Sequence, residues 1–262
     1  MNLDLHNKRA IVCGSTQGIG KAVAMELAQM GAHVTLIARN ETSLKQVKSE
    51  LPDTGSQLHS YLCVDFNNPE QLRELVTQFI QRTGPVNILV NNTGGPPAGP
   101  ILNAKAEEFL SAFNNHLICN HILVQACADG MKNSGYGRII NVISTSVKQA
   151  LPNLGVSNTI RAAVGNWAKT LANELGKSGI TVNNVLPGAT STQRLSTIIE
   201  NKALKTNVKN DDVKKEMLHE IPLGRFAEAA EIASAVAFLA SPAAAYINGI
   251  NLPVDGGRTS SL

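Results

Sequence analysis

A glycine-rich turn near the start of the chain has the residue types that bind a nucleotide pyrophosphate. It consists of Gly14, Ser15, Thr16, Gln17, Gly18, Ile19 and Gly20. The first glycine permits a tight turn, the second lets the backbone approach a pyrophosphate, and the third lets a helix and a strand pack closely. Free N–H groups and the positive end of a helix would favour the phosphates. The spacing is G-x-x-x-G-x-G rather than G-x-G-x-x-G, so the spacing alone is weak evidence for a nucleotide site. The position of the motif, after a predicted strand and before a predicted helix, strengthens this interpretation.

The residue that follows the second apolar run bears on which nucleotide would bind. This run ends at Ala38, where an acidic residue would accept the ribose hydroxyls of NAD, and Arg39 comes next. The planar guanidinium of Arg39 matches a 2′-phosphate, although a solvated arginine in a turn is the alternative. The pattern therefore favours NADP(H) over NAD(H).

The elements that must position these residues alternate along the chain. Short β-branched or aliphatic runs predict buried strands at residues 9–14, 33–38, 58–64, 86–92, 138–144, 180–188 and 250–257. Periodic segments between them predict helices at residues 20–30, 42–51, 69–83, 106–131, 158–175 and 228–239. Such alternation is typical of an α/β protein with helices on both faces of a sheet. We expect a doubly wound Rossmann fold with a mostly parallel seven-stranded sheet, whose ligands bind at the carboxyl ends of the strands.

Composition restricts the class of protein. The 262 residues, 43% of them hydrophobic, suffice for one large core, and no segment resembles a linker, so one domain over residues 1–262 is expected. A formal net charge of +3 without a long basic run argues against a nucleic-acid partner. The N-terminus lacks the features of a signal peptide, and no apolar run reaches membrane-spanning length. We therefore expect a cytoplasmic protein without a membrane partner.

The cysteines give no sign of a metal or redox site. Cys13, Cys63, Cys119 and Cys127 lie in apolar surroundings without CxxC or metal-ligand spacing. They are expected to be buried, reduced thiols. Since no cluster of histidines, cysteines and carboxylates is present in the sequence, no metal site is expected.

Further motifs carry a family resemblance over nearly the whole length. They are CGSTQGIG, Val64-Asp65-Phe66, Asn91-Asn92-Thr93-Gly94, Pro187-Gly188 followed by Thr192, Pro222-Leu223-Gly224-Arg225, and GINLPVDGG. With them the chain resembles single-domain short-chain dehydrogenases/reductases, close to the 3-oxoacyl-[acyl-carrier-protein] reductases. The resemblance adds to the cofactor site of the glycine turn the residues Asp65, Phe66, Asn91, Thr93, Gly94, Arg161, Pro187, Gly188 and Thr192.

The resemblance also implies four catalytic positions, and this chain keeps one of them. The family uses a Ser to hold the substrate oxygen, a Tyr to exchange a proton with it, a Lys to hold the nicotinamide ribose, and an Asn to support a water chain. Ser144 matches the serine. Ser157 occupies the tyrosine position and Arg161 the lysine position. The asparagine position falls on His116, or on Asn115 if the alignment slips by one residue.

The missing phenol is not supplied elsewhere in the sequence. None of Tyr61, Tyr136 and Tyr246 begins a helix four residues before a basic residue. Removing a general acid typically lowers a rate by about 10²–10⁴-fold. Arg161 can bind ribose hydroxyls and supply positive charge, but it cannot relay a proton.

Two rescues are conceivable. His116 titrates near neutrality and could donate the proton, unless it is a helix histidine satisfied by a backbone carbonyl. Ser144, Ser157 and Arg161 could together form a polar pocket for a substrate oxygen or carboxylate.

Three other segments bear on the substrate and on assembly. The run Thr93-Gly94-Gly95-Pro96-Pro97-Ala98-Gly99-Pro100 resembles that of an atypical subgroup of the reductases with a degenerate tetrad, although a structural proline turn is the alternative. Residues 190–222, polar and ambiguous between loop and helix, occupy the position of the family's substrate lid. The helices at 106–131 and 158–175 imply a homotetramer or homodimer.

These features support two main hypotheses. The first is an NADP-dependent oxidoreductase that acts on a carbonyl/alcohol pair of a small molecule or acyl thioester, with a non-standard proton donor. The second is a catalytically silent dinucleotide-binding sensor or scaffold, which the residues at 157 and 161 favour. Acid–base chemistry other than hydride transfer is a third, less favoured reading.

Overall fold

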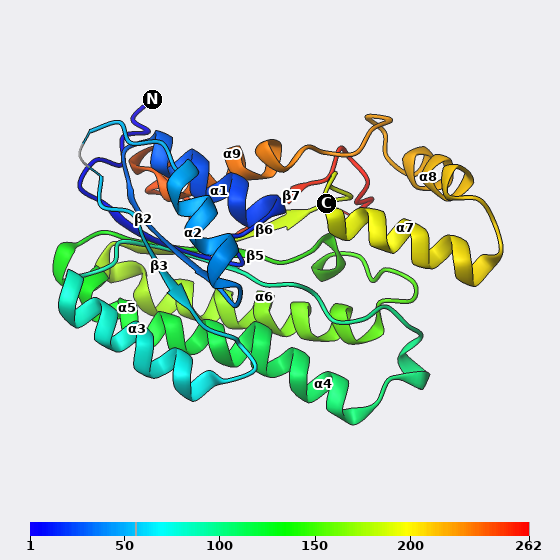
Figure 1. The fold of residues 1–262 in the computed structure, drawn as a ribbon, viewed down its shortest axis with the longest axis horizontal. Helices are drawn as coiled ribbons and strands as arrows, with labels where there is room; N and C mark the ends of the chain where they lie inside the picture. Colours follow the sequence, from blue (N-terminus) through cyan, green and yellow to red (C-terminus); the bar gives the residue numbers. More distant parts are fainter. Residues whose placement is uncertain (56, 262) are drawn as a thin grey trace.

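The computed structural model describes residues 1–55 and 57–261. Within them, seven strands form one sheet in the order β3-β2-β1-β4-β5-β6-β7, and every neighbouring pair is parallel (Figure 1). The strands are β1 (Arg9–Cys13), β2 (His33–Ala38), β3 (Ser60–Cys63), β4 (Ile88–Asn92), β5 (Gly137–Val142), β6 (Ile180–Pro187) and β7 (Asn251–Val254). Strand order reverses between β1 and β4, as in a doubly wound sheet. The predicted Rossmann fold is confirmed.

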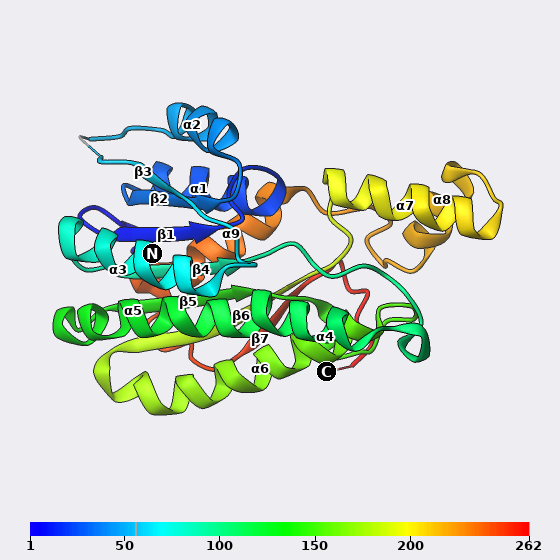
Figure 2. The same cartoon turned by 60° about the horizontal axis from the view of Figure 1, so that its bottom comes forward.

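Helices cover both faces of the sheet. They are α1 (Gly18–Gln29), α2 (Glu41–Glu50), α3 (Pro69–Thr83), α4 (Ala106–Phe113), α5 (Cys119–Ser134), α6 (Gly155–Leu175), α7 (Gln193–Thr206), α8 (Asn210–His219) and α9 (Ala229–Ala240). One buried cluster joins α1, α2 and α9 to the sheet, and a second joins α3, α5 and α6 to the opposite face. Figures 1 and 2 show these two layers, with α7 and α8 extending past one end of the sheet.

Two segments differ from the sequence-based expectation. The single helix expected over residues 106–131 is divided into α4 and α5 by a π-helical turn at Asn114–Ile118. A π-turn adds a residue without changing the side-chain types, so apolar periodicity does not reveal it. Residues 190–222, left open between loop and helix, contain α7 and α8.

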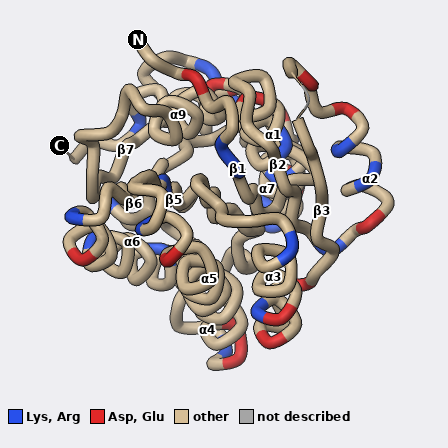
Figure 3. Tube along the Cα trace, turned by 90° about the vertical axis from the view of Figure 1, so that its left-hand side faces the viewer, with Lys and Arg blue, Asp and Glu red and all other residues tan. Residues whose placement is uncertain are grey.

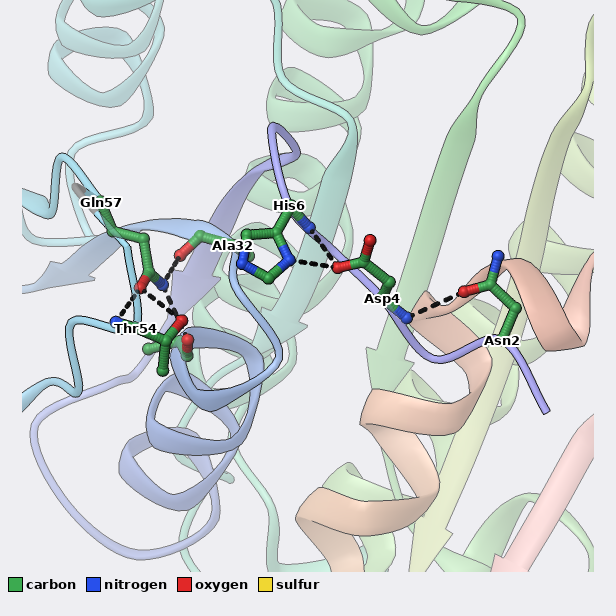
Figure 4. Close-up of polar contacts among 7 residues, drawn as sticks. Asn2, Asp4, His6, Ala32, Thr54 and Gln57 are labelled. Atoms are coloured by element: carbon green, nitrogen blue, oxygen red, sulfur yellow. Dashed lines mark hydrogen bonds and ion pairs between the residues drawn. The ribbon is translucent and has the colours of Figure 1, made fainter.

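The amino ends of the strands are closed by structural hydrogen bonds. The Gln57 side chain donates to the carbonyls of Ala28 (2.7 Å) and Ala32 (2.8 Å), while its oxygen accepts from the Thr54 N–H (2.6 Å). The nearby His6 ring hydrogen-bonds Asp4 (Figure 4). Gln57 thus satisfies carbonyls at the end of α1 and ties the chain before β3 to the segment between α1 and β2, while the contact of His6 with Asp4 is local to the N-terminal segment.

A ladder of side-chain amides crosses the other half of the sheet. Each Nδ2 donates to the next Oδ1: Asn91 to Asn141 (2.8 Å), Asn141 to Asn184 (2.9 Å), and Asn184 to Asn251 (2.8 Å). These residues are paired in register on β4, β5, β6 and β7. Because a one-residue slip of any strand would break the chain of hydrogen bonds, the ladder fixes the level at which these four strands end.

The cysteines follow the expectation with one exception. Cys13, Cys119 and Cys127 are buried and free, and burial raises the thiol pKa of both Cys119 and Cys127 to about 12. Cys63 is exposed, and it is the last residue of β3, the edge strand of the sheet. The expectation of burial is therefore wrong for Cys63.

Charged residues lie mainly on the outer helices and loops, where acidic and basic groups are interspersed (Figure 3). No helix of the described residues has both the length and the apolar character needed to cross a membrane. Among residues 1–55 and 57–261, no group of three or more His, Cys, Asp or Glu side chains could hold a metal ion.

Candidate active site

The glycine turn links the end of β1 to the start of α1. Gly14 and Gly18 have φ angles of +58° and +53°, a region that side chains disfavour. A Cβ on Gly20 would lie only 2.1 Å from the Gly14 carbonyl oxygen. Gly14 and Gly20 therefore serve the turn and the helix–strand contact, and α1 begins at Gly18 with its N–H groups at the carboxyl edge of the sheet.

The other residues of the turn have distinct positions. Ser15 is fully buried and its hydroxyl lies 3.4 Å from the Ile37 carbonyl of β2, whereas Gln17 is exposed. Thr16 and Ile19 are half-buried, and Ile19 packs against the core beneath α1. The turn is thus anchored at Ser15 and open at Gln17.

Asn92, rather than Asn91, supports this turn. The Asn92 Nδ2 donates to the carbonyls of Cys13 (3.2 Å) and Gly14 (3.3 Å). Asn91 points to the opposite face of the sheet, into the amide ladder, because neighbouring residues of a strand alternate between faces. The structure therefore does not bring the side chain of Asn91 to the nucleotide site. The sequence motif Asn91-Asn92-Thr93-Gly94 already contained Asn92. Because side chains alternate between the faces of a strand, only one of the two asparagines can face the glycine turn.

Arg39 and Asp65 lie after β2 and β3 at the same edge of the sheet. Arg39 is exposed, and no hydrogen bond or ion pair of its guanidinium is formed with the described residues. The Asp65 carboxylate accepts from the Asn67 N–H (2.9 Å), and Phe66 packs partly buried against the core. The guanidinium of Arg39 is free to meet an anion, as expected for a 2′-phosphate site.

The segment after β6 closes the nucleotide site from the other side. Pro187 ends β6, and the Gly188 N–H donates to Val254 of β7 (3.0 Å). Thr192 caps α7 by accepting from the Leu195 N–H (3.4 Å). A Cβ on Gly18 would lie 3.2 Å from the Thr192 methyl group. The first turn of α7 therefore lies directly against the glycine turn.

The carboxyl end of β5 meets the start of α6 at the candidate catalytic residues Ser144, Ser157 and Arg161. The Arg161 Nε donates to the Ser157 hydroxyl (3.3 Å), and its Nη1 donates to the carbonyls of Val142 (3.4 Å) and Ile143 (2.8 Å). Ser144 follows Ile143, and its Oγ accepts from the Ser146 N–H (3.1 Å). The serine at 157 and the arginine at 161 are thus bonded to each other, and the arginine links the start of α6 to the end of β5.

Arg161 is a buried cation. Its residue is 8% exposed and Ser157 is 7% exposed. Burial, and then the positive charge of Arg194, lowers the pKa of Arg161 to about 10. The guanidinium remains charged at neutral pH, and its strength as a hydrogen-bond donor is enhanced in this dry environment.

Arg194 is a site residue that the sequence did not single out. It lies in the first turn of α7, and its Nη1 donates to the Gly95 carbonyl (3.2 Å). The residue is exposed as a whole, while partial burial of its guanidinium lowers its pKa. A Cβ on Gly95 would lie 2.6 Å from the Arg194 Nη2 and 3.2 Å from the Arg161 Nη2. Two guanidinium groups therefore converge on one glycine. Arg194 comes two residues after Thr192, which the sequence had already assigned to the cofactor site, and this closeness in sequence could have identified Arg194 as a site residue.

The glycine-proline run holds Gly95 in this place. The Gly99 N–H donates to the Asn153 carbonyl (2.7 Å), and the Gly155 N–H donates to the Gly99 carbonyl (3.3 Å). A Cβ on Gly155 would lie 2.5 Å from the Ile101 Cβ, so the run packs tightly on the start of α6. It acts as a fixed wall of the site.

His116 reaches the same cluster from the π-helical turn. It is 4% exposed, and its Nδ1 hydrogen-bonds the Thr93 hydroxyl (2.6 Å). Burial, then the charges of Arg161 and Arg194, lower the pKa of His116 to about 3, although a hydrogen bond with the Gly94 backbone opposes the shift. The expectation that His116 titrates near neutrality is wrong here, because two neighbouring cations and a dry setting disfavour the imidazolium.

Asn115, the alternative to His116, and the three tyrosines lie away from Ser144 and Arg161. The Asn115 side chain donates to Asn67 (3.1 Å), outside the cluster. The Tyr136 hydroxyl donates to the Ala240 carbonyl (2.7 Å) before β5 begins, Tyr61 bonds Glu41, and Tyr246 is exposed. No tyrosine of the described residues contacts Ser144 or Arg161, so the phenol is lost from the site.

The buried neutral histidine makes the stability of the fold depend on pH. Its pKa is about 3 in the folded chain against 6.5 for the free group, so its contribution is complete above pH 6.5 and is lost as the pH falls toward 3. Between about pH 6 and pH 4, wild type should lose about 1.4 kcal/mol per pH unit relative to His116→Gln. Urea unfolding of both proteins at several pH values measures the difference. A constant difference across this range would contradict the buried, neutral state.

Comparisons with known proteins agree with this geometry. The family model described as Enoyl-(Acyl carrier protein) reductase matches residues 14–259. The chain is similar to the 3-oxoacyl-[acyl-carrier-protein] reductase FabG of Vibrio cholerae, at 36% identity over 97% of this chain and 98% of that protein. It is also similar to the L-xylulose reductase of Mesocricetus auratus, at 34% identity over 98% of each chain.

Solved structures give the same picture. L-sorbose reductase from Gluconobacter frateurii, complexed with NADPH and L-sorbose, matches with a TM-score of 0.93 and 29% identity over the full length of both chains. YwfH, an NADPH-dependent reductase involved in bacilysin biosynthesis, matches with a TM-score of 0.91 and 28% identity, over 97% of this chain and 99% of that one.

Proposed function

The chain belongs to the short-chain dehydrogenase/reductase family, and from this premise we propose that it transfers a hydride between NADP(H) and a carbonyl/alcohol substrate without a phenolic acid. The observation that carries the proposal is the first turn of α7. Thr192 lies against Gly18 of the glycine turn, and two residues later Arg194 lies beside Arg161. The glycine turn and a pair of cations are thereby joined at one edge of the sheet.

The residues present fit NADP(H). The left-handed Gly14 and Gly18 and the crowded Gly20 form a tight turn that leaves backbone N–H groups at the start of α1 open to a pyrophosphate, and a side chain at Gly14 or Gly20 would clash with that turn. The guanidinium of Arg39, which has no partner among the described residues, suits a 2′-phosphate. Of the similar solved structures, L-sorbose reductase is complexed with NADPH and YwfH is described as NADPH-dependent. The cofactor is NADP(H). Asp65, Phe66, Thr93, Gly94, Pro187, Gly188 and Thr192 are proposed to complete its site.

The chain's own residues would orient and stabilise the substrate. NADPH supplies the hydride when it is bound. Ser144 and Ser157 each accept a hydrogen bond at Oγ, from Ser146 and Arg161 respectively, so their hydroxyl protons remain to be donated to a substrate oxygen. The positive charge of Arg161 would stabilise negative charge developing on that oxygen. Since His116 stays neutral, it would position Thr93 rather than supply the proton, which would come from a hydroxyl or water.

Wider features of the molecule are proposed on the same basis. The 262 residues would act as one domain in which residues 190–222 form a substrate lid. A homotetramer or homodimer, built through α4, α5 and α6, would cover the exposed Leu110 and Phe113 of α4. We place the protein in the cytoplasm, with a small molecule or acyl thioester as substrate.

The function is tested by NADPH oxidation with a panel of 3-oxoacyl thioesters and small ketones, alongside NADPH binding followed by fluorescence. Turnover together with binding is expected. Binding without turnover on every substrate would contradict the proposal and favour the silent sensor or scaffold. Retained turnover after Ser144→Ala would contradict the proposed role of Ser144.

The choice of nucleotide makes a separate prediction at Arg39. Arg39→Gln should raise the Kd of NADPH about 10- to 100-fold, because a charge-assisted bond to the 2′-phosphate is lost, and should leave NADH within about twofold. Arg82→Gln, at an exposed arginine near the end of α3, is the matched control. Equal weakening of both nucleotides by the Arg39 substitution would show that this residue does not read the 2′-phosphate.

A further inference from the structure

The guanidinium groups of Arg161 and Arg194 form a pair that no carboxylate in the described part of the chain neutralises. The two groups come from different elements, α6 and α7, and both approach Gly95 within the distances given above. The partners of Arg161 are a hydroxyl and two carbonyls, and the partner of Arg194 is one carbonyl. The structure thus holds two positive charges together with only neutral partners.

This pairing differs from the arginine–carboxylate pairs of the molecule, such as Arg225 with Glu231 and Arg258 with Glu220. Arg225 donates two hydrogen bonds of 2.7 Å to Glu231, as exposed arginines commonly do. The charges of Arg161 and Arg194, in contrast, repel each other, and Arg194 is a cause of the lowered pKa of Arg161. Keeping like charges in a partly dry site costs free energy unless an anion joins them. The arrangement is therefore one that a bound anion would stabilise.

The free donors favour a planar anion with two oxygens. The Nη1 of each arginine is used by backbone carbonyls, whereas the described residues give neither Nη2 a hydrogen-bond partner. Gly95 leaves room between the two Nη2 atoms where a side chain would clash. Arg161 borders this space and is bonded through its Nε to Ser157 and through its Nη1 to Ile143, the residue before Ser144. An anion held there would therefore be near the hydroxyl groups proposed to orient the reacting carbonyl or alcohol.

We propose that the Arg161–Arg194 pair binds a carboxylate of the substrate, so that this chain acts on oxo or hydroxy acids in preference to neutral carbonyl compounds. The inference rests on the proposed function, in which the substrate has a carbonyl or alcohol carbon that exchanges a hydride with NADP(H). It assigns Arg194 a role in substrate specificity. The phosphates of the nucleotide already have the glycine turn and Arg39, which leaves the substrate as the source of the anion.

The experiment compares acids with their uncharged amides. The probes are acetoacetate with acetoacetamide, and 4-phenyl-2-oxobutanoate with its primary amide. For each, kcat/KM is measured with NADPH, and binding to the complex of the protein with NADP⁺ is measured by calorimetry. The proteins are wild type, Arg194→Gln, and Lys202→Gln as a matched control, because Lys202 lies on the same helix but is paired with Glu216.

We expect wild type to prefer at least one acid over its amide. Arg194→Gln should weaken binding and kcat/KM for that acid about 10- to 100-fold, the effect of losing a charge-assisted hydrogen bond, and should leave the amide and the Kd of NADPH within about twofold. Lys202→Gln should change neither. Arg161→Gln should also weaken binding of the acid.

Three results would overturn the proposal. The first is that wild type prefers neither acid over its amide, and the second is that Arg194→Gln weakens acid and amide equally. The third is a selective loss of NADPH binding in Arg194→Gln, which would show that the anion is a phosphate of the nucleotide. The calorimetric measurement separates this proposal from the proposed function. Binding of an acid that depends on Arg194 but occurs without turnover would support the carboxylate site and contradict hydride transfer. Absence of both binding and turnover would contradict both.

Discussion

Gly20→Ala should abolish NADPH binding at accessible concentrations, with a Kd raised about 100-fold or more, because the added Cβ displaces the phosphate cradle. In the wild-type fold this atom would lie 2.1 Å from the Gly14 carbonyl oxygen and 2.7 Å from the Asn92 Nδ2. Either α1 must move away from the turn, or the turn must open and lose its hydrogen bonds to Asn92. Fluorescence titration with NADPH measures the loss.

The same substitution should also destabilise the protein by about 1–3 kcal/mol, as overpacking of a close contact does. Urea unfolding shows whether the chain still folds. Gly55→Ala is the matched control, because no atom lies within 4 Å of the added Cβ and its backbone is not left-handed. NADPH binding by a folded Gly20→Ala protein with wild-type affinity would mean that the nucleotide does not use this turn.

Arg161→Gln should lower kcat/KM about 10²–10³-fold, the usual effect of removing one preorganised donor from a developing negative charge. Glutamine can still accept or donate a hydrogen bond near Ser157, but it brings no charge to the pocket. The Kd of NADPH should change by less than about tenfold, because the glycine turn and Arg39 are unaffected. Single-turnover kinetics and nucleotide titration separate the two effects.

A stability measurement distinguishes a catalytic role of Arg161 from a structural one. A buried cation that no carboxylate of the described residues neutralises carries a desolvation cost, and glutamine removes this cost while keeping hydrogen-bonding groups, so the free energy of unfolding of Arg161→Gln should be unchanged or higher by about 1 kcal/mol. Arg161→Lys keeps the charge on a shorter group and should recover part of the activity. A variant that loses stability and activity together would contradict this assignment.

Much of the fold and part of the site were predictable from local sequence. Alternating apolar runs and helical segments required a parallel sheet, and the glycine spacing placed a nucleotide turn after β1. The spacing from Ser144 that the family resemblance supplies put residues 157 and 161 at the beginning of a helix expected over 158–175, and the structure begins that helix, α6, at Gly155.

The remainder depends on contacts between distant segments. Arg194 is 33 residues from Arg161 in the sequence, and only the path of the chain from β6 into α7 brings them together. The pKa of His116 depends on burial produced by a π-helical turn, which periodicity does not disclose. The amide ladder requires the strand order and register of β4 to β7, so single strands do not reveal it.

The central claim is that this site transfers a hydride by fixed positive charge and hydroxyl donors, without a titrating acid. Its most direct test is the pH dependence of single-turnover NADPH oxidation, followed by stopped-flow absorbance with a saturating substrate. Since the pKa of His116 is lowered to about 3 and that of Arg161 to about 10, the rate should be constant from about pH 6 to about pH 9. A rate that changes tenfold per pH unit within that range, and whose inflection disappears in His116→Gln, would contradict the account.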